Sequence, residues 1–287
     1  MSRAKKIAYQ GEPGANSHLA CRNAYAAYEP VPCPTFEDAF AAVRSGAADL
    51  AMIPIENSVA GRVADIHHLM PTSRLHIVAE YFLPVRHQLL APKNATLKTI
   101  KSVESHVQAL GQCRNIIRRL GLKPIVAADT AGSAREVAER GDPTRAAIAS
   151  QLAAKTYKLK ILRKNVEDEK HNTTRFIVLS RRAKWAPPRP RKTITTFVFQ
   201  VRNIPAALYK AMGGFATNGI NMTKLESYMV GGSFFATQFY ADVEGHPKDA
   251  ALERALEELA FVSQPKSLRI LGVYAAHRFR DTLAKAK

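Results

Sequence analysis

The sequence of 287 residues has few cysteines, a single tryptophan and no long hydrophobic run. Cys21, Cys33 and Cys113 are an odd number of thiols without the clustered spacing of a metal site, so we expect buried free cysteines rather than a disulfide framework. No uninterrupted apolar stretch approaches the ~20 residues of a membrane-spanning helix. These absences exclude a transmembrane protein and a small disulfide-rich secreted domain.

Several motifs of cofactor and hydrolase chemistry are also missing. The turn Gly11-Glu-Pro-Gly14 lacks the Lys-Ser/Thr of a P-loop and the full dinucleotide fingerprint, which disfavours ATP and NAD. A lone glycine turn of this kind is more often plain turn structure than an anion-binding nest. There is no HExxH, no pair of CxxC motifs and no Ser-His-Asp order, so a metal hydrolase or a covalent hydrolase is not favoured. We expect no cofactor and no metal.

Acidic residues are scarce relative to basic ones, and the formal net charge is +18. The excess lies mostly before residue 186, but it is scattered, and no basic helix with interleaved aromatics is present. Scattered charge suits a cleft for a small polyanion, and we expect neither nucleic acid nor membrane as a partner. The basic start is followed by a polar turn instead of an apolar signal core, which predicts a cytoplasmic protein.

A short run of prolines at 186–193 divides the chain, because it forbids a helix or a central strand there. We expect one region at 1–185, a linker at 186–192, a second domain at 193–275 and a basic tail at 276–287. The second domain reads as strand, helix, strand, strand, helix and strand, at 193–201, 205–217, 223–230, 233–243, 249–259 and 268–274. That order is typical of a ferredoxin-like fold.

Before the linker, short apolar strands alternate with helices, which predicts parallel sheet and two α/β lobes with a ligand in the crevice between them. A helix should begin near Asn16, and another should follow the capping box of Thr35 and Asp38. Further helices are expected at 107–120, at 130–140 and up to residue 157. Strands are expected at 6–9, 49–55, 123–128, 146–150 and 175–180, with a strand pair at 77–82 and 85–91.

Polar segments that follow predicted strands are the candidate binding sites. Glu56, Asn57 and Ser58 should emerge together at a strand end, either as ligands or as the cap of the next helix. Ser105, His106 and Gln108 form a second such segment, for which a solvated helix start is favoured. His87 alternates with apolar neighbours and is predicted to be a satisfied core histidine.

The segment Asn172-Thr-Thr-Arg-Phe176 has a richer chemistry. It should place Thr173, Thr174 and Arg175 just before a buried strand, where the guanidinium is able to hold a carboxylate through two hydrogen bonds. The alternative is turn structure with a surface arginine. From the residues alone, the chain has a cleft for a small anionic ligand, and its chemistry remains open.

The segments IAYQGEPGANSHLA, PIENSVAG, SHVQALGQC, DTAGSA, AAIAS and NVEDEKHNTTRFIVLSR stand in this order over roughly residues 6 to 182. They resemble the monofunctional prephenate dehydratases, and the region after the linker resembles the ACT domain that follows in that family. The resemblance implies an α/β protein in which a two-lobed catalytic domain, similar to type II periplasmic binding proteins, precedes a ferredoxin-like βαββαβ ACT domain. It also implies conversion of prephenate to phenylpyruvate, water and carbon dioxide in phenylalanine synthesis.

The implied chemistry agrees with the charge of the chain, because prephenate is a dianion that a cationic, amide-lined cleft would bind. The resemblance makes Thr174 the essential catalytic residue, through a hydrogen bond to the leaving hydroxyl. Glu56 is expected to be structural, and a buried acid near the leaving hydroxyl is the alternative. The implied substrate-binding residues are Asn57, Ser58, Gly61, Ser105, Gln108, Thr173, Arg175 and Phe176.

The ACT resemblance implies phenylalanine as an effector. Family members commonly have Gly-Ala-Leu in the first helix of this domain and Glu-Ser-Arg-Pro on the next strand, whereas this chain has Ala206 for the glycine and Tyr228-Met229 for Arg-Pro. The implied effector-binding residues are Ala206, Ala207, Leu208, Asn221, Glu226 and Ser227. Because ACT domains pair at sheet edges, we expect a homodimer or homotetramer.

Three alternatives remain open from the sequence. Arogenate dehydratase acts on the amino analogue of prephenate, and no residue here separates the two substrates. A non-catalytic amino-acid sensor is the alternative from another class, which retention of Thr174 disfavours. Nucleic-acid binding by the basic surface is the third and weakest alternative.

Overall fold

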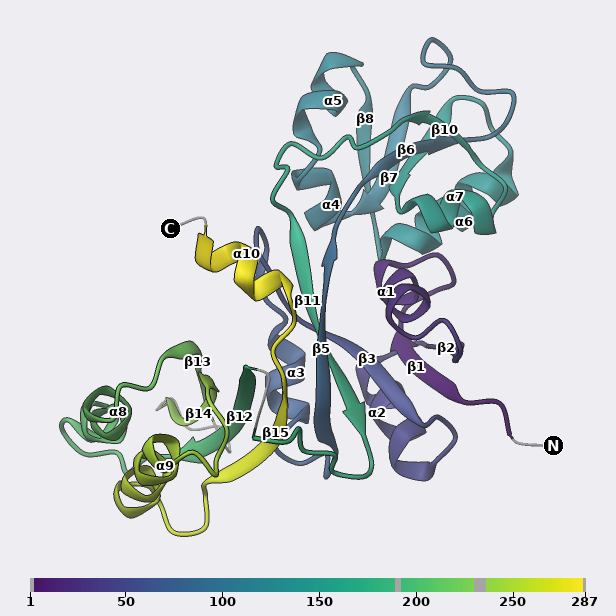
Figure 1. Cartoon of the computed structure of the whole chain (residues 1–287). Coiled ribbons are helices and arrows are strands. Elements are labelled where there is room, and N and C mark those ends of the chain that lie inside the picture. The colour runs from purple at the N-terminus through teal and green to yellow at the C-terminus, as the bar shows by residue number, and fades with distance from the viewer. Residues whose placement is uncertain (1–2, 189–191, 230–235, 286–287) are drawn as a thin grey trace. The chain divides into compact units, whose positions relative to one another are not determined.

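The structure is a computed structural model that describes residues 3–188, 192–229 and 236–285 (Figure 1). The chain forms two compact units, the first of Met1–Val63 with Tyr81–Phe176 and the second of Ala64–Glu80 with Ile177–Lys287. It passes from one unit to the other after Val63, within strand β5, His76–Pro84, and within strand β11, Thr173–Ser180. Among the described residues, no helix is both long and apolar enough to cross a membrane.

The first unit contains two sheets, which form two lobes. In the first lobe the strand order is β11-β3-β1-β2, with β1 at Lys6–Gln10, β2 at Glu29–Cys33 and β3 at Leu50–Asn57. β1 is parallel to both β2 and β3, and the short β4, Gly61–Arg62, pairs antiparallel with the end of β3. The predicted parallel sheet is confirmed here.

The helices of the first lobe are set by local sequence. Helix α1 covers Asn16–Ala24, and helix α2 covers Phe36–Ser45. The Thr35 side chain accepts from the Asp38 backbone N–H and the Asp38 carboxylate accepts in return, so the predicted capping box is confirmed.

The second lobe has the strand order β10-β6-β9-β7-β8. Helices α4 and α5 cover one face of this sheet, and α6 and α7 cover the other (Figure 1). Each face of the sheet packs on its own hydrophobic cluster. The neighbouring residues Leu89 and Leu90 of β6 belong to different clusters, as expected for a strand with both faces buried. The elements are β6 Gln88–Ala91, β7 Ser102–His106, α4 Val107–Gly111, α5 Arg114–Arg119, β8 Lys123–Ala127, α6 Thr130–Arg140, β9 Arg145–Ala149, α7 Gln151–Thr156 and β10 Lys160–Arg163.

The second unit contains the predicted βαββαβ order, so the ferredoxin-like prediction is confirmed. Its strand order is β13-β14-β12-β15-β5, with antiparallel pairs among β12 to β15 and a parallel contact of β15 with β5. Helices α8 and α9 pack on this sheet over a core that includes Phe197, Phe215 and Leu252. The elements are α3 Ala64–Leu69, β12 Thr193–Gln200, α8 Ala207–Thr217, β13 Met222–Met229, β14 Ala236–Glu244, α9 Ala250–Val262, β15 Arg269–Ala275 and α10 Phe279–Lys285.

Four local predictions were wrong. The helix expected at 107–120 is broken into α4 and α5, because the Gln112 carbonyl accepts from the Asp168 N–H at 2.7 Å and the Asp168 carboxylate accepts from the Asn115 N–H. The strands β5 and β6 both form, but they lie in different sheets and do not pair with each other. Helix α8 begins after Pro205 because Ala206 adopts a left-handed backbone conformation.

The fourth difference concerns the predicted site. Thr173, Thr174 and Arg175 are the first residues of β11 and do not precede it. Strand geometry therefore sends their side chains alternately to opposite faces. The predicted glycine turn at 231–232 and the start of the following strand lie outside the described residues.

Candidate active site

Thr174 lies at the point where the start of β11 meets the end of β3. Its side chain is partly exposed, and its Oγ1 accepts a hydrogen bond from Asn57 Nδ2 at 2.9 Å. A hydroxyl that accepts through its oxygen keeps its own hydrogen for another acceptor. The arrangement therefore leaves Thr174 able to donate to a molecule bound beside it.

The orientation of the Asn57 amide is fixed by the backbone that follows it. Its Oδ1 accepts from the N–H groups of Val59 at 2.9 Å and Ala60 at 2.8 Å. An atom that faces two N–H donors must be the oxygen, so the amide nitrogen faces the other way. There it donates to Thr174 and to Asn172 Oδ1, the latter at 2.8 Å.

Ser58 joins the end of β3 to the start of β11 through hydrogen bonds. Its backbone N–H donates to the Thr173 carbonyl at 2.9 Å, and its Oγ accepts from the Thr173 N–H at the same distance. The Ser58 hydroxyl in turn donates to the His171 carbonyl at 2.8 Å. The predicted segments 56–58 and 172–176 are thus brought together, and Ser58 has a structural position in that junction.

Arg175 and Phe176 are both buried, in contrast to the partly exposed Thr174. The Arg175 side chain is only 3% exposed and donates to Glu56 Oε1 at 2.9 Å. Phe176 is 1% exposed and belongs to the core. These positions favour a structural role for Glu56, Arg175 and Phe176, since a buried guanidinium already paired with a carboxylate is poorly placed to bind a second one.

The other predicted substrate-binding residues occupy different places. Ser105 is fully buried in β7 and donates to the Ile148 carbonyl at 2.6 Å. Gln108 is exposed at the start of α4, where its N–H donates to the capping His106 side chain. Gly61 is exposed in β4, opposite Asn57, with a φ of 82°. Within the described parts of the chain, no hydrogen bond joins Ser105 or Gln108 to Thr174.

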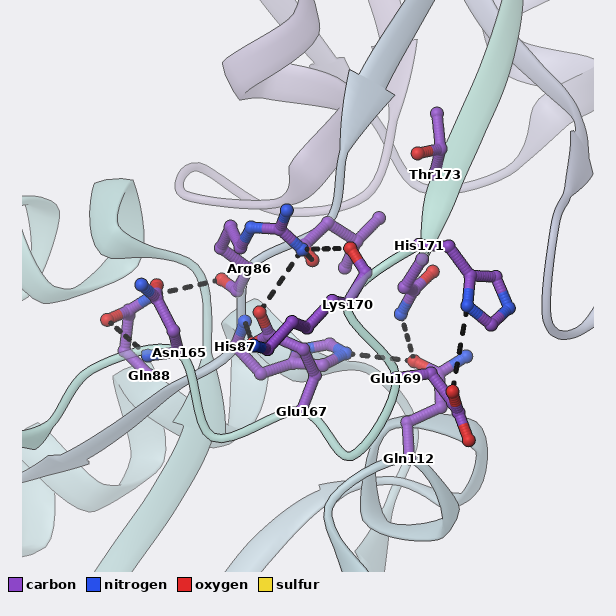
Figure 2. Close-up of polar contacts among 12 residues, drawn as sticks. Arg86, His87, Gln88, Gln112, Asn165, Glu167, Glu169, Lys170, His171 and Thr173 are labelled. Carbon is purple, nitrogen blue, oxygen red and sulfur yellow. Dashed lines mark hydrogen bonds and ion pairs between the residues drawn. The ribbon is translucent and has the colours of Figure 1, made fainter. Parts of the chain in front are cut away.

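Sequence reasoning missed a hydrogen-bond network behind Asn57. Asn172 Nδ2 donates to Gln112 Oε1 at 2.8 Å. His87 Nε2 lies 3.0 Å from the same oxygen (Figure 2). His87 is 3% exposed, so the predicted satisfied core histidine is confirmed. Burial lowers its pKa, which keeps the ring neutral at neutral pH. Asn172 and Gln112 each stand in a motif noted above, but only the fold brings them together.

The glycine turn at 11–14 is structural. The Gly14 N–H donates to His18, and its carbonyl accepts from the Ser150 hydroxyl at 2.5 Å. A Cβ on Gly14 would lie 2.7 Å from the Ala153 Cα, so only glycine fits this contact between the lobes. Glu12 receives two hydrogen bonds from Arg135 of α6, at 2.9 and 3.1 Å. The interpretation as a turn is therefore confirmed.

A pocket and the predicted effector residues lie on segments other than β3 and β11. The pocket, of about 430 Å³, is lined by residues of α5 and of 163–168, and it contains none of the predicted site residues. In the second unit, the predicted effector residues fall at the start of α8, just before β13 and within β13. Among the described residues, no cluster of three or more His, Cys, Asp or Glu side chains is placed to hold a metal ion.

Comparison with known proteins identifies the family of this chain. The model of the prephenate dehydratase family matches residues 7–184. The chain belongs to the prephenate dehydratase family. This assignment confirms the resemblance of residues 6–182 to prephenate dehydratase, and it makes the protein a hydro-lyase of this family.

Similar proteins extend over the whole chain. The bifunctional N-acyl-homoserine lactone acylase/prephenate dehydratase of Komagataeibacter europaeus is 52% identical over 280 residues, covering 98% of this chain and 99% of that protein. A solved structure of GqqA, described as a novel type of quorum quenching acylase, is 53% identical with a TM-score of 0.90, covering 96% of this chain and 100% of that one. The prephenate dehydratase of Arthrobacter aurescens in complex with L-Phe is 29% identical with a TM-score of 0.86, covering 98% and 99%.

Proposed function

We propose that this member of the prephenate dehydratase family converts prephenate to phenylpyruvate at the junction of β3 and β11. The observation that supports this site is the hydrogen bond from Asn57 Nδ2 to Thr174 Oγ1. A donated hydrogen bond polarises the Thr174 hydroxyl and makes it a better donor. Thr174 then donates to the C4 hydroxyl of prephenate as that group leaves.

The reaction is a loss of carbon dioxide coupled to a loss of water. The bond from the ring carbon to its carboxylate breaks, its electrons move through the ring, and the C–O bond at C4 breaks to complete the aromatic system. One proton is taken up, so prephenate dianion gives phenylpyruvate anion, carbon dioxide and water. A threonine hydroxyl is a weak acid, so we assign it a hydrogen bond to the leaving oxygen and assign the proton to a water molecule.

Substrate contacts are proposed for the exposed side of the same junction. Asn57, Ser58 and Gly61 lie at this junction, which supports their place in the binding surface. Thr173 stays a predicted substrate-binding residue, although it is buried and its side chain alternates with that of Thr174 along the strand. Ser105, Gln108, Arg175 and Phe176 remain predicted substrate-binding residues. For Arg175 and Phe176 their burial supports an indirect role, in which they hold β11 in place.

The test is turnover of purified protein with prephenate and with arogenate at neutral pH. Thr174→Ala should lower kcat on prephenate roughly 100-fold or more, as loss of one hydrogen bond made in the transition state does in other enzymes. Thr174→Ser keeps the hydroxyl and should retain most of kcat. An alanine variant with wild-type turnover would remove Thr174 from the mechanism. Turnover of arogenate without turnover of prephenate would make arogenate the substrate.

We also propose that the βαββαβ region at 193–275 is an ACT domain that binds L-phenylalanine, with residues 1–185 as the catalytic domain and 186–192 as the linker. The relative from Arthrobacter aurescens was solved with L-Phe, which supports this effector. The proposed contacts are Ala206, Ala207, Leu208, Asn221, Glu226 and Ser227. Calorimetric titration with L-phenylalanine, with L-leucine as control, tests this binding.

The same region supports a homodimer or homotetramer. Strand β13 is at the edge of its sheet in the described part of the chain, and Leu225 and Met229 on it are 39% and 52% exposed. Tyr209 on α8 is 81% exposed. An exposed apolar edge of this kind is an association surface. Light scattering should therefore give a mass of two or four chains, and a monomer would contradict the proposal.

A cytoplasmic location is proposed as well. The three cysteines are free and buried, which fits a reducing compartment. Fractionation of cells that produce the protein tests the location.

A second candidate activity is hydrolysis of N-acyl-homoserine lactones. The observation that favours it is the 52% identity over 98% of this chain with a protein named for that activity. The step adds water across the amide bond and gives a carboxylate and homoserine lactone. Mass spectrometry should detect both products in equal amounts, and absence of homoserine lactone above a protein-free control would exclude the activity. Thr174→Ala in the same assay tells whether both activities use one site.

A further inference from the structure

His87 lies in the segment that joins β5 to β6, and its ring is buried behind the proposed site. It is separated from Thr174 by three amide side chains, those of Gln112, Asn172 and Asn57. Each consecutive pair in this series is joined by a hydrogen bond of 2.8 to 3.0 Å. The series is therefore continuous from the imidazole to the hydroxyl.

The direction of every hydrogen bond in the series follows from its fixed end. Asn57 presents its nitrogen to Asn172, so Asn172 must present its oxygen to Asn57 and its nitrogen to Gln112. Gln112 must then present its oxygen, and the same oxygen faces His87 Nε2 at 3.0 Å. An imidazole nitrogen that faces a carbonyl oxygen has to bear the hydrogen. The neutral His87 ring is thereby fixed with its hydrogen on Nε2.

The backbone around His87 is held as firmly as its ring. The His87 N–H donates to Glu167 Oε2 at 2.9 Å, and its carbonyl accepts from the Val166 N–H at 2.9 Å. Glu167, whose side chain is 4% exposed, also accepts from Arg86 Nη1, which donates in addition to the Lys170 carbonyl (Figure 2). These contacts bind His87 to the segment that leads into Asn172.

We propose that His87 is a positioning residue for the dehydration, which orients Gln112 and, through Asn172 and Asn57, the Thr174 hydroxyl. The inference rests on the proposed function and deepens it. Without the donor at Nε2, the Gln112 amide is free to turn its nitrogen toward the nitrogen of Asn172. Asn57 is unable to turn in response, since two backbone N–H groups hold its oxygen. The two facing amide nitrogens are then relieved only by movement of Asn172, which disturbs the position of Thr174.

The first test compares two variants of His87. His87→Leu removes the donor and should lower kcat about 10- to 100-fold with little change in KM, because small misplacements of a catalytic group have effects of this size. His87→Gln places an amide N–H near the position of Nε2 and should restore most of kcat. A general packing defect would lower the activity of both variants alike, and that result would overturn the proposal.

The matched control is His246, which is 2% exposed in the second unit and hydrogen-bonds the Ala186 carbonyl. His246→Leu should lower the melting temperature and leave kcat unchanged. In wild-type protein, nitrogen NMR of labelled histidine should show the His87 hydrogen on Nε2. A hydrogen on Nδ1 would overturn the series of hydrogen bonds whatever the activity, and this measurement needs no variant to fold.

A double-mutant cycle separates a connected series from independent effects. In an Asn172→Ala background the series is already cut, so His87→Leu should cause no further loss of kcat. Additive losses would overturn the proposal. Wild-type protein without turnover of prephenate would refute the proposed function and this inference together, whereas an active wild type with an equally active His87→Leu would refute this inference alone.

Discussion

At the scale of single residues, Ala206 has an unusual backbone conformation for an alanine, with φ 59° and ψ 14°. This left-handed region places Cβ close to the following carbonyl oxygen, whereas glycine adopts it without penalty. We expect Ala206→Gly to stabilise the protein by about 1 kcal/mol, since the strain relieved exceeds the added entropy of the unfolded chain. Thermal unfolding without effector should show a melting temperature about 2 °C higher.

The matched control for this prediction is Ala216→Gly, an exposed position with helical backbone near the end of α8. Glycine in a helix is unfavourable by about 1 kcal/mol relative to alanine, so this variant should melt lower. If both glycine variants were destabilised, the left-handed conformation of Ala206 would not be a source of strain.

Sequence alone predicted part of the candidate site. Asn57, Ser58 and Thr174 were identified because polar residues at strand ends and the family motifs point to them, and the structure places them in one junction. His87 was recognised only as a core residue, because its connection to Thr174 passes through three side chains, those of Gln112, Asn172 and Asn57, that only the fold brings together. Arg175 was expected near a ligand carboxylate, and its partner Glu56 is separated from it by 119 positions. Contacts of this range follow from the fold.

At the scale of elements, the sequence predicted correctly those helices and strands whose ends are set by neighbouring residues in the chain. Helix α6 has the predicted bounds because Asp129 caps its start and Gly141 ends it in a left-handed conformation. The helix expected at 107–120 failed because Asp168, distant in sequence, interrupts it. The strand β2 was not predicted, since two of its five residues are prolines and it lies at the edge of its sheet.

The contact between the 11–14 turn and α6 should make stability depend on pH. The hydrogen bond from Arg135 lowers the pKa of Glu12 below its ordinary 4.5. A lowered carboxylate pKa stabilises the folded state above the ordinary value, and that stabilisation is lost as the pH falls through the lowered pKa. Glu12→Gln should therefore melt below wild type at neutral pH, and the difference should shrink below pH 4.5.

Glu257→Gln on α9 is the control for this comparison, because Glu257 is exposed. Its melting temperature should follow that of wild type across the pH range. A constant difference between Glu12→Gln and wild type from neutral to acidic pH would contradict the assigned role of Glu12, as it would show that titration of this carboxylate is not linked to unfolding.

At the scale of the whole molecule, the end of the chain is tied to a buried charge. Glu80 in β5 has a fully buried side chain and accepts two hydrogen bonds from Arg280 of α10, at 2.7 and 2.8 Å. Removing one partner of a buried ion pair costs about 3–5 kcal/mol, because the remaining charge stays buried. Arg280→Ala should lower the stability of the second unit by that order in urea unfolding.

Arg278→Ala is the matched control, since Arg278 is exposed close to the same helix. It should change stability by less than about 0.5 kcal/mol. Adding Glu80→Gln to Arg280→Ala removes the buried charge and should recover part of the loss. Equal stability of Arg280→Ala and Arg278→Ala would mean that α10 does not contribute to folding through this pair.

The central claim is that this chain dehydrates and decarboxylates prephenate at the junction of Asn57 and Thr174. The most direct measurement is carbon NMR of prephenate labelled at the ring carboxylate, incubated with the protein at neutral pH. We predict labelled carbon dioxide and phenylpyruvate in equal amounts with wild type and Thr174→Ser, and a rate near the protein-free blank with Thr174→Ala. Wild-type rates equal to the blank, or equal rates for wild type and Thr174→Ala, would contradict the claim.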